Sequence, residues 1–387
     1  MIPVEEAQAR VLAMARPLPA EDLALPQAAG RWLAVPVTAR ADQPPFDASA
    51  MDGYAVQGDP APGDSFAVIG ESGAGHGFAG TVAPGQAVRI FTGAPLPPGA
   101  TRVVIQENTS RDGDRITVTA TDHNSNIRLR GVDFPAGATL SPRRLRPADL
   151  SLLAAMNLAR VPCARRPVVA LLMTGDELVM PGEEPRADQI IASNGFALKA
   201  MAEAEGAEAH LLPIARDTEA SLRQAFDLAA DADIVVTIGG ASVGDHDLVG
   251  KVARDLGMKP AFWKIAMRPG KPLMAGRMGR AAMLGLPGNP VSAIVTGHLF
   301  LLPLIRAMQG DPAPLPRPRQ ARLAIDLPAT GPRTHYMRAR LTGDAIAPFD
   351  RQDSSLLTIL TEADALLIRP KDDGPRQAGE TVPYLPL

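Results

Sequence analysis

Three apolar runs separated by two helical segments constrain the fold of this chain more than any other feature. Between residues 166 and 250, the runs RPVVALLM, AEAHLLPI and ADIVVTI predict strands, and the segments 193–206 and 217–232 have helical spacing. This alternation predicts βαβ units in a parallel sheet. Because such sheets bind ligands outside the carboxyl ends of their strands, the residues that follow each run are candidates for a site.

Each of the three predicted strands is followed by residues with functional groups. They are Thr174-Gly175-Asp176-Glu177 after the first, Arg216-Asp217 after the second, and Gly239-Gly240-Ala241-Ser242 with Gly244, Asp245 and Asp247 after the third. Taken alone, the third loop is better explained as a simple glycine turn, and Asp217 as a residue that caps or precedes a helix. The convergence of three strand ends favours a ligand site.

The combination of glycines and carboxylates indicates a phosphate group bridged by a cation. Glycines let the backbone approach closely and direct N–H groups at a phosphate. Carboxylates alone would repel it, whereas Mg²⁺ prefers one or two carboxylates together with phosphate oxygens. We therefore expect a divalent cation at this edge of the sheet.

Two further loops carry features of an anion site. In WKIAMRPGKP (263–272), a Pro-Gly turn gathers Lys264, Arg268 and Lys271, which is typical of an oxyanion grip or, alternatively, of a solvated basic loop. LPGNPVSA (286–293) predicts a rigid loop before a helix that Asn289 caps. The N–H groups of that helix and Ser292 could receive an anion, although a plain capped helix has the same sequence.

The remainder of the chain predicts several smaller modules. Residues 4–15 and 148–158 have helical spacing. Residues 44–137 contain the short runs FAVI, AVRIF, VVIQ and ITVT between turn residues, which predicts an all-β module. A proline-rich linker, 310–320, precedes short β-like runs in 321–387. A chain of 387 residues is expected to form two to four domains.

Several functional classes are excluded or disfavoured. The net charge of −3 provides no general attraction to nucleic acid or to an anionic membrane. The dinucleotide, P-loop and G-x-S-x-G motifs are absent, and the six histidines lack paired ligand spacing. One cysteine, Cys163, rules out a Cys-rich zinc site and an intrachain disulfide, and fits a cytoplasmic location.

No targeting or membrane segment is expected from the sequence. The acidic, amphipathic N-terminus lacks the basic start and apolar core of a signal peptide. The longest apolar stretch, 291–305, contains His298 and Pro303 and is predicted to be too short to span a bilayer.

Six motifs taken together resemble one family. In order, they are SAMDGYA, FTGAPLP, TGDEL with the later Ser193-Asn194, GGASVGDHD, RPGKP and LPGNPVS. This set resembles the molybdopterin molybdenumtransferases of the MoeA and gephyrin E-domain type over nearly the whole chain. Residues 166–310 alone also resemble the molybdopterin adenylyltransferase domain, but SAMDGYA and the β module favour the transferase.

The resemblance implies a multidomain fold and a homodimer. The expected fold is an elongated chain with a central three-layer α/β domain around a mostly parallel sheet, a β-rich insertion and a C-terminal β-barrel-like module. The implied divisions are an N-terminal helix packed on the α/β domain (1–24), a connecting subdomain (25–44 with 138–164), a β-rich subdomain (45–137), the α/β pterin-nucleotide-binding domain (165–310) and a C-terminal domain (317–387). Sites between the subunits of an elongated homodimer are implied.

The implied activity is molybdate insertion into adenylylated molybdopterin, with release of AMP in the presence of Mg²⁺ or a similar cation. Two alternatives remain: adenylyl transfer to molybdopterin, and a non-catalytic scaffold that binds the cofactor precursor. Transient contact with the adenylyltransferase and other pathway proteins is expected, without nucleic acid or membrane partners.

The resemblance also assigns residues by matched motif. Candidate catalytic residues are Asp52, Thr92, Asp133, Asp176, Glu177 and Lys264. Candidate pterin-nucleotide and phosphate ligands are Thr174, Gly175, Ser193, Asn194, Gly239, Gly240, Ser242, Pro287 and Pro290. Candidate molybdate ligands are Arg268, Lys271, Pro272, Ser292, Arg338 and Ser354. Candidate metal ligands are Asp217 and Asp247. The family usually has lysine where Arg268 stands, a change that keeps the charge and alters the hydrogen-bond geometry.

Overall fold

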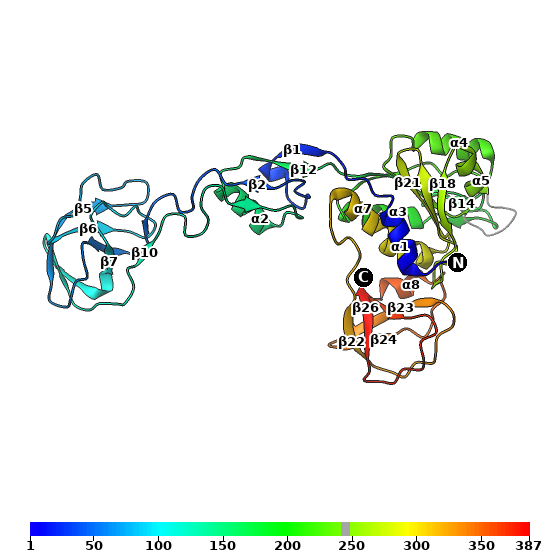
Figure 1. Ribbon diagram of the computed structural model, residues 1–387. Coiled ribbons are helices and arrows are strands. Elements are labelled where there is room, and N and C mark those ends of the chain that lie inside the picture. Colours follow the sequence, from blue (N-terminus) through cyan, green and yellow to red (C-terminus); the bar gives the residue numbers. More distant parts are fainter. Residues whose placement is uncertain (241–247) are drawn as a thin grey trace. The chain divides into compact units, whose positions relative to one another are not determined.

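The chain forms two compact units, shown in Figure 1. The computed structural model describes residues 1–240 and 248–387. One unit is Asp22–Cys163, and the other combines Met1–Glu21 with Ala164–Leu387. The second unit contains all three predicted strands and both predicted anion loops, so the central site is built within it.

A six-stranded sheet organises this larger unit. Its order is β16 (Glu208–Leu211), β13 (Val168–Met173), β17 (Ile234–Ile238), β21 (Ala281–Leu286), β20 (Met274–Met278) and β18 (Lys259–Trp263). The first four strands are parallel, which confirms the predicted βαβ units. Strands β20 and β18 add an antiparallel edge that the alternation of strands and helices did not predict.

Helices cover both faces of the sheet and give the expected three layers. One face packs on α1 (Val4–Leu12), α3 (Asn194–Ala204), α6 (Pro290–Thr296) and α7 (Leu302–Gln309), and the other on α4 (Glu219–Leu228) and α5 (Leu248–Asp255). Strand β13 shows the reason: Val169 and Leu171 belong to the first core, whereas Ala170 and Leu172 belong to the second. Because strand side chains alternate, a strand buried on both faces must be apolar throughout.

The apolar stretch near residue 300 forms a longer helix than the sequence suggested. Helix α6, a π-helical turn at Gly297–Leu301 and α7 run without a break from Pro290 to Gln309, which is 20 residues. By length and hydropathy this helix could cross a membrane, so the expectation of a stretch too short to do so was wrong. However, 78% of its apolar window is buried within the protein, where it forms part of the helical layer on the sheet.

The C-terminal residues form a closed barrel. Its strands are β22 (Arg319–Leu323), β23 (Thr334–Thr342), β24 (Ala345–Pro348), β25 (Ala365–Arg369) and β26 (Thr381–Pro386), and α8 (Leu357–Thr361) lies between β24 and β25. A short strand of the α/β part, β19 (Met267–Arg268), pairs in parallel with β23. This pairing fixes the RPGKP loop against the C-terminal module.

The smaller unit is mainly β structure. Its six-stranded sheet has the order β7 (Arg102–Ile105), β4 (Gly53–Val56), β6 (Gln86–Ile90), β5 (Ser65–Ser72), β9 (Arg115–Val118) and β8 (Thr109–Asp112). Four of these strands contain the four apolar runs named above, which confirms the predicted β module. Three short ladders pair β1 (Ala20–Ala24) with β12 (Arg160–Ala164), β2 (Val37–Thr38) with β11 (Thr139–Leu140), and β3 (Ala48–Ser49) with β10 (Ile127–Arg128). Helix α2 (Pro147–Ala155) covers most of the segment 148–158 that was predicted to be helical, and it begins one residue earlier, at Pro147.

Candidate functional site

The carboxyl ends of four parallel strands meet at one edge of the sheet. The amide of Thr174 donates to the carbonyl of Ile238 (3.1 Å), and the amide of Gly239 donates to the carbonyl of Leu286 (3.1 Å). A parallel bridge from Thr174 to Ala215 places the start of the Arg216-Asp217 loop beside them. The predicted convergence of three strand ends is confirmed, and β21 adds its Pro-Gly-Asn loop as a fourth.

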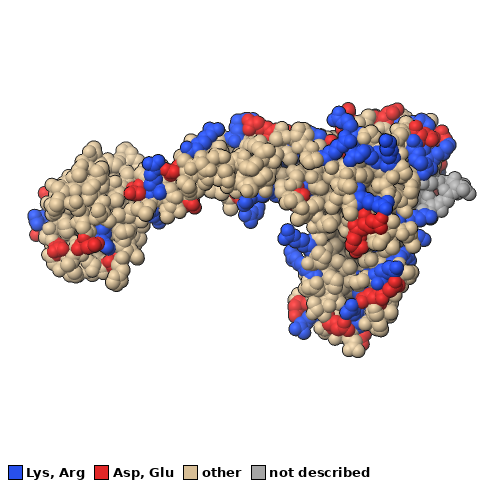
Figure 2. Space-filling view, viewed as in Figure 1, with Lys and Arg blue, Asp and Glu red and all other residues tan. Residues whose placement is uncertain are grey.

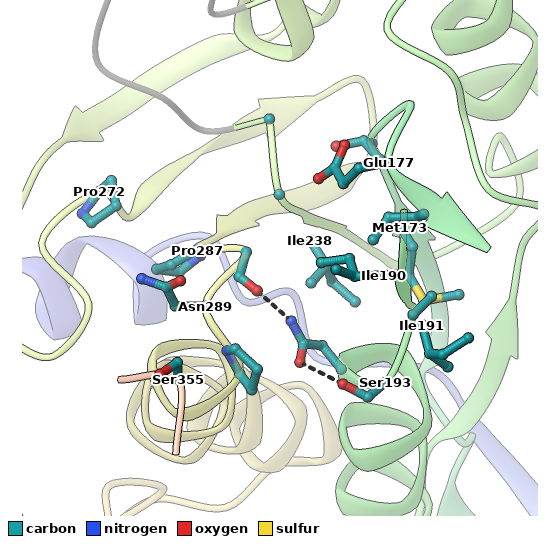
Figure 3. A pocket seen from close by; sticks show the side chains of 18 residues that line it. Met173, Glu177, Ile190, Ile191, Ser193, Ile238, Pro272, Pro287, Asn289 and Ser355 are labelled. Carbon is teal, nitrogen blue, oxygen red and sulfur yellow. Dashed lines mark hydrogen bonds between the residues drawn. The ribbon is translucent and has the colours of Figure 1, made fainter. Parts of the chain in front are cut away.

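A cavity of about 660 Å³ opens at this edge (Figure 3). The predicted residues that line it are Thr174, Glu177, Ser193, Asn194, Gly239, Gly240, Pro272, Pro287 and Pro290. Its apolar walls include Met173, Leu178, Ile238 and the doublet Ile190-Ile191, which pairs as β15 (Ile190–Ile191) with β14 (Leu178–Val179). The side-chain amide of Asn194 donates to the carbonyl of Gly288 (2.6 Å) and ties α3 to the fourth loop. Apolar walls with a few placed polar groups suit a ring-containing ligand.

Close backbone packing explains the paired glycines after β17. Gly239 has φ +93°, and a Cβ there would lie 2.8 Å from the carbonyl oxygen of Thr174. Gly240 has φ +64°, and its Cβ would lie 2.3 Å from Cγ2 of Val249. The hydroxyl of Thr174 is buried beside them and has no hydrogen-bond partner among the described residues. Only glycine fits both positions without strain.

Substituting Gly239 with alanine is expected to lower the free energy of unfolding by about 1–3 kcal/mol, because backbone strain and a clash with Thr174 add together. Gly182 is a matched control, since it has the same φ of +93° and open space around its Cβ. Chemical denaturation of both variants measures the difference. Equal losses in the two variants would show that the contact with Thr174 contributes nothing.

Carboxylates cluster beside the cavity. The amide of Asp217 donates to Oδ1 of Asp176 (3.1 Å). Burial, followed by the charges of Asp176 and Glu177, raises the pKa of Asp217 above its usual value. Such crowding of negative charge suits a cation held by oxygen ligands. Among the residues that the structure describes, no three acidic, histidine or cysteine side chains come close enough to hold a metal ion by themselves.

Residues 241–247 of the predicted glycine loop lie outside the described residues. They include Ser242 and Asp247, predicted as a phosphate ligand and a metal ligand, and Asp245. Asp217 is therefore the described member of the predicted metal pair.

A second, cationic cleft of about 330 Å³ lies where the RPGKP loop meets the C-terminal module. The predicted residues that line it are Arg268, Lys271, Pro272, Ser292 and Ser354, and Arg333 joins them from the turn before β23. The side chains of Arg268, Lys271 and Arg333 have no hydrogen bond or ion pair with described residues. Asp353 also lines the cleft, but its Oδ1 accepts from the amide and the hydroxyl of Ser355 (2.9 and 2.7 Å), so the positive charge of the three side chains is available to an anion. On the face drawn in Figure 2, acidic and basic side chains are interspersed.

Asn289 occupies the N-cap position of α6 but does not cap it, which corrects the expectation from sequence. Its side-chain amide instead donates to the hydroxyl of Ser354 (3.1 Å). The amide of Val291, in the first turn, donates to the carbonyl of Ser354 (3.0 Å). The helix start therefore holds the Ser354 loop, and one of the N–H groups expected to be free for an anion is already used.

Arg338 and Lys264 do not line either cavity. Arg338 is 1% exposed, and its guanidinium donates to the carbonyls of Leu356 (3.1 Å) and Arg351 (3.3 Å). It therefore contacts the loop that carries Ser354. Lys264 has φ +64° at the base of the basic loop, where its amide donates to the carbonyl of Leu273 (2.9 Å).

The remaining candidates lie in the smaller unit. The amide and the hydroxyl of Thr92 donate to Oδ1 of Asp52 (2.7 and 2.8 Å), and these bonds hold the pKa of Asp52 below its usual value. The structure therefore brings Asp52 and Thr92 together. Asp133 is exposed, and its amide donates to the carbonyl of Gln43 (3.0 Å).

Some of the residues that line the cavities were missed by sequence reasoning. The doublet Ile190-Ile191 could have been found from the sequence, because it lies just before the Ser193-Asn194 motif. No signal in the sequence pointed to Arg333 and Gln352, because only the docking of the C-terminal module brings them to the cleft.

Comparison with known proteins identifies the family. Three family models match in succession: the MoeA N-terminal region (domain I and II) over residues 2–157, the probable molybdopterin binding domain over 170–307, and the MoeA C-terminal region (domain IV) over 320–387. A molybdopterin molybdenumtransferase from Haemophilus influenzae is 34% identical over 100% of this chain and 99% of the relative. The chain belongs to the MoeA family of molybdopterin molybdenumtransferases.

Other MoeA-family proteins agree. A molybdopterin molybdenumtransferase from Nostoc is 40% identical over 73% of this chain and 67% of the relative. A solved MoeA structure from Pyrococcus horikoshii has a TM-score of 0.85 and 29% identity over 100% of this chain and 99% of that chain. The matches to the N-terminal and C-terminal MoeA regions lie outside the part that resembles adenylyltransferases, so that alternative is not favoured.

Proposed function

We propose that this chain inserts molybdate into adenylylated molybdopterin and releases AMP. The observation that carries the proposal is that two different cavities adjoin each other. One has mixed apolar and polar walls, and the other is cationic. Both are lined by Pro272 and Asn289. A pterin nucleotide in the first would therefore have its reacting end beside an oxyanion in the second. The names of the curated relatives support the same activity.

The cleft provides the chemistry that a tetrahedral dianion needs. Arg268, Lys271 and Arg333 supply positive charge, and the hydroxyls of Ser292 and Ser354 supply hydrogen bonds. Such groups are fixed before the reaction, so they hold the oxyanion without reorganising around it. The neighbouring cavity orients the pterin nucleotide between its isoleucine wall and the backbone of Gly239 and Gly240.

Mg²⁺ or a similar divalent cation fits the carboxylate cluster. Asp217, with Asp176 or Glu177, supplies hard oxygen ligands, and Asp247 is the further ligand expected from the motif. When bound, the cation neutralises the phosphates and polarises the bond to be cleaved. The raised pKa of Asp217 supports this assignment, because the neighbouring charges of Asp176 and Glu177 disfavour its ionised form and a bound cation would offset them.

The functional assembly in this proposal is a homodimer. Asp52, Thr92 and Asp133 reach a site of the partner copy, and the adenylyltransferase of the same pathway delivers the substrate transiently in the cytoplasm. Light scattering should give twice the chain mass of 40.6 kDa, and a monomer would contradict the dimer.

The decisive experiment measures AMP release from adenylylated molybdopterin with and without molybdate, with tungstate as a competitor. We expect release only when molybdate is present. Adenylylation of molybdopterin from ATP with no need for molybdate would instead support the adenylyltransferase. Tight binding with no turnover under either condition would support a scaffold.

A further inference from the structure

A third cavity, of about 270 Å³, lies in the C-terminal module beside the cationic cleft. It is lined by the turn between β22 and β23, by His335 on β23 and by Arg369 on β25. The pairing of β19 with β23 places Arg268 opposite His335, and both residues line the cavity. No acidic side chain is among the described residues that line it. The molybdate site proposed above shares Arg268 and Arg333 with this cavity and none of its other lining residues.

The cavity contains a buried guanidinium with a free edge. The side chain of Arg369 is 2% exposed, and its Nε donates to Asp373 (2.6 Å). Its Nη2 donates to the carbonyls of Pro328 (3.2 Å) and Gly374 (2.7 Å). Its Nη1 has no partner among the described residues. Asp373 also pairs with Arg376 (2.7 Å), and Arg376 pairs in turn with Glu380 (3.1 Å), so the charge of Arg369 is balanced within this network and the unbalanced positive charge at the cavity comes from Arg268 and Arg333.

Two arginines line both this cavity and the cleft. Arg268 and Arg333 are common to the two sites, and neither has an ion-pair partner in the described part of the chain. The imidazole of His335 also makes no hydrogen bond there. Unpaired guanidiniums with a planar set of donors are strong ligands for tetrahedral oxyanions.

We infer that this cavity is a second oxyanion site, which takes an inorganic phosphate- or sulfate-type anion and weakens oxyanion binding in the cleft. An anion here would draw on the charge of Arg268 and Arg333, which the cleft also needs. Two anions of like charge so close together must each lower the affinity for the other. The coupling rests on the proposed molybdate site, whereas anion binding in the cavity does not.

Inorganic phosphate is the probe. Molybdate affinity, measured by calorimetry at constant ionic strength, should fall about threefold to tenfold as phosphate is added and then reach a plateau. A plateau is the signature of a separate site. A loss that continues to grow in proportion to phosphate would mean that phosphate occupies only the cleft, and would overturn the inference.

Gly331 offers a matched pair of variants. It lines the cavity, has no left-handed φ, and a Cβ there would have open space around it. Gly331→Glu places a fixed negative charge at the cavity and should lower molybdate affinity while abolishing the phosphate response. Gly331→Gln has the same size without the charge, so its molybdate affinity without phosphate should match wild type. A full phosphate response in Gly331→Glu would contradict the proposal.

His335 gives a readout that does not involve molybdate. Burial and four surrounding arginines lower its pKa to about 4. The four are Arg268, Arg333, Arg338 and Arg369. A bound phosphate would offset that charge, so proton NMR should show the pKa of His335 rising on phosphate addition. An unchanged pKa would remove the proposed site. If the pKa of His335 rises with phosphate but the protein shows no molybdate-dependent AMP release, the anion site in the cavity is supported and the proposed transferase activity is refuted.

Discussion

Replacing Asp217 with asparagine is expected to reduce AMP release by about a hundredfold or more and yet to raise the thermal stability of the protein. The loss of activity follows from removing a charged oxygen ligand of the proposed cation. The gain in stability follows from removing a charge that partial desolvation and the repulsion of Asp176 and Glu177 disfavour in the folded chain. The same substitution is therefore expected to lower activity and to raise thermal stability.

The pH dependence of this effect has a defined sign. The pKa of Asp217 is higher in the folded chain than the ordinary aspartate value of 3.8, so the folded protein disfavours the ionised form. The penalty is absent below pH 3.8, grows as pH rises from there to the folded-state pKa, and stays constant above it. The melting temperatures of wild type and Asp217→Asn should therefore converge at low pH and differ near neutral pH.

Asp227→Asn is a suitable control, because Asp227 is exposed on α4 and lines neither proposed site. It should leave activity unchanged. Asp247→Asn, at the other predicted metal ligand, should lose activity to a similar degree as Asp217→Asn. Normal turnover in both Asp217→Asn and Asp247→Asn would refute the metal assignment.

Replacing Arg338 with methionine is expected to weaken molybdate binding by about tenfold or more and to lower the free energy of unfolding by about 2–4 kcal/mol. Arg338 is fully buried, and its two bonds to the 351–356 loop hold Ser354 at the cleft. Methionine fills much of the same volume but leaves the carbonyls of Arg351 and Leu356 without donors. The loop should then lose its fixed position.

Arg340, two residues along the same strand, is the matched control. It is exposed and pairs with Glu362 (2.7 Å), and surface ion pairs of this kind contribute about 0–1 kcal/mol. Arg340→Met should therefore change both quantities little. Calorimetry with molybdate and denaturant unfolding test the comparison. If Arg338→Met binds molybdate as wild type does, the loop does not depend on this guanidinium.

The parallel sheet and its functional edge were predictable because both follow from local patterns. A strand buried on two faces must be apolar along its length, as Val168–Met173 is, and a ligand edge needs glycines and polar groups where the strand stops. The antiparallel edge of β20 and β18 was not predictable in the same way. Strand direction depends on pairing between distant segments, and short apolar runs look alike in either direction.

The roles of individual side chains were likewise predictable where they follow from local sequence, and were not predictable where they depend on tertiary contacts. Sequence alone determined that Asp176, Glu177 and Asp217 would share one edge, because each follows a strand of one parallel sheet. It also determined that the basic loop would present cations. Only the tertiary structure decided that Asn289 holds Ser354 instead of capping α6, that Arg338 supports the loop from beneath, and that Arg333 joins the cleft. The contact of Asn289 with Ser354 joins residues 65 positions apart, and those of Arg338 join residues 13 and 18 positions apart. Such contacts depend on how the chain packs in three dimensions, which the neighbouring residues in the sequence do not determine.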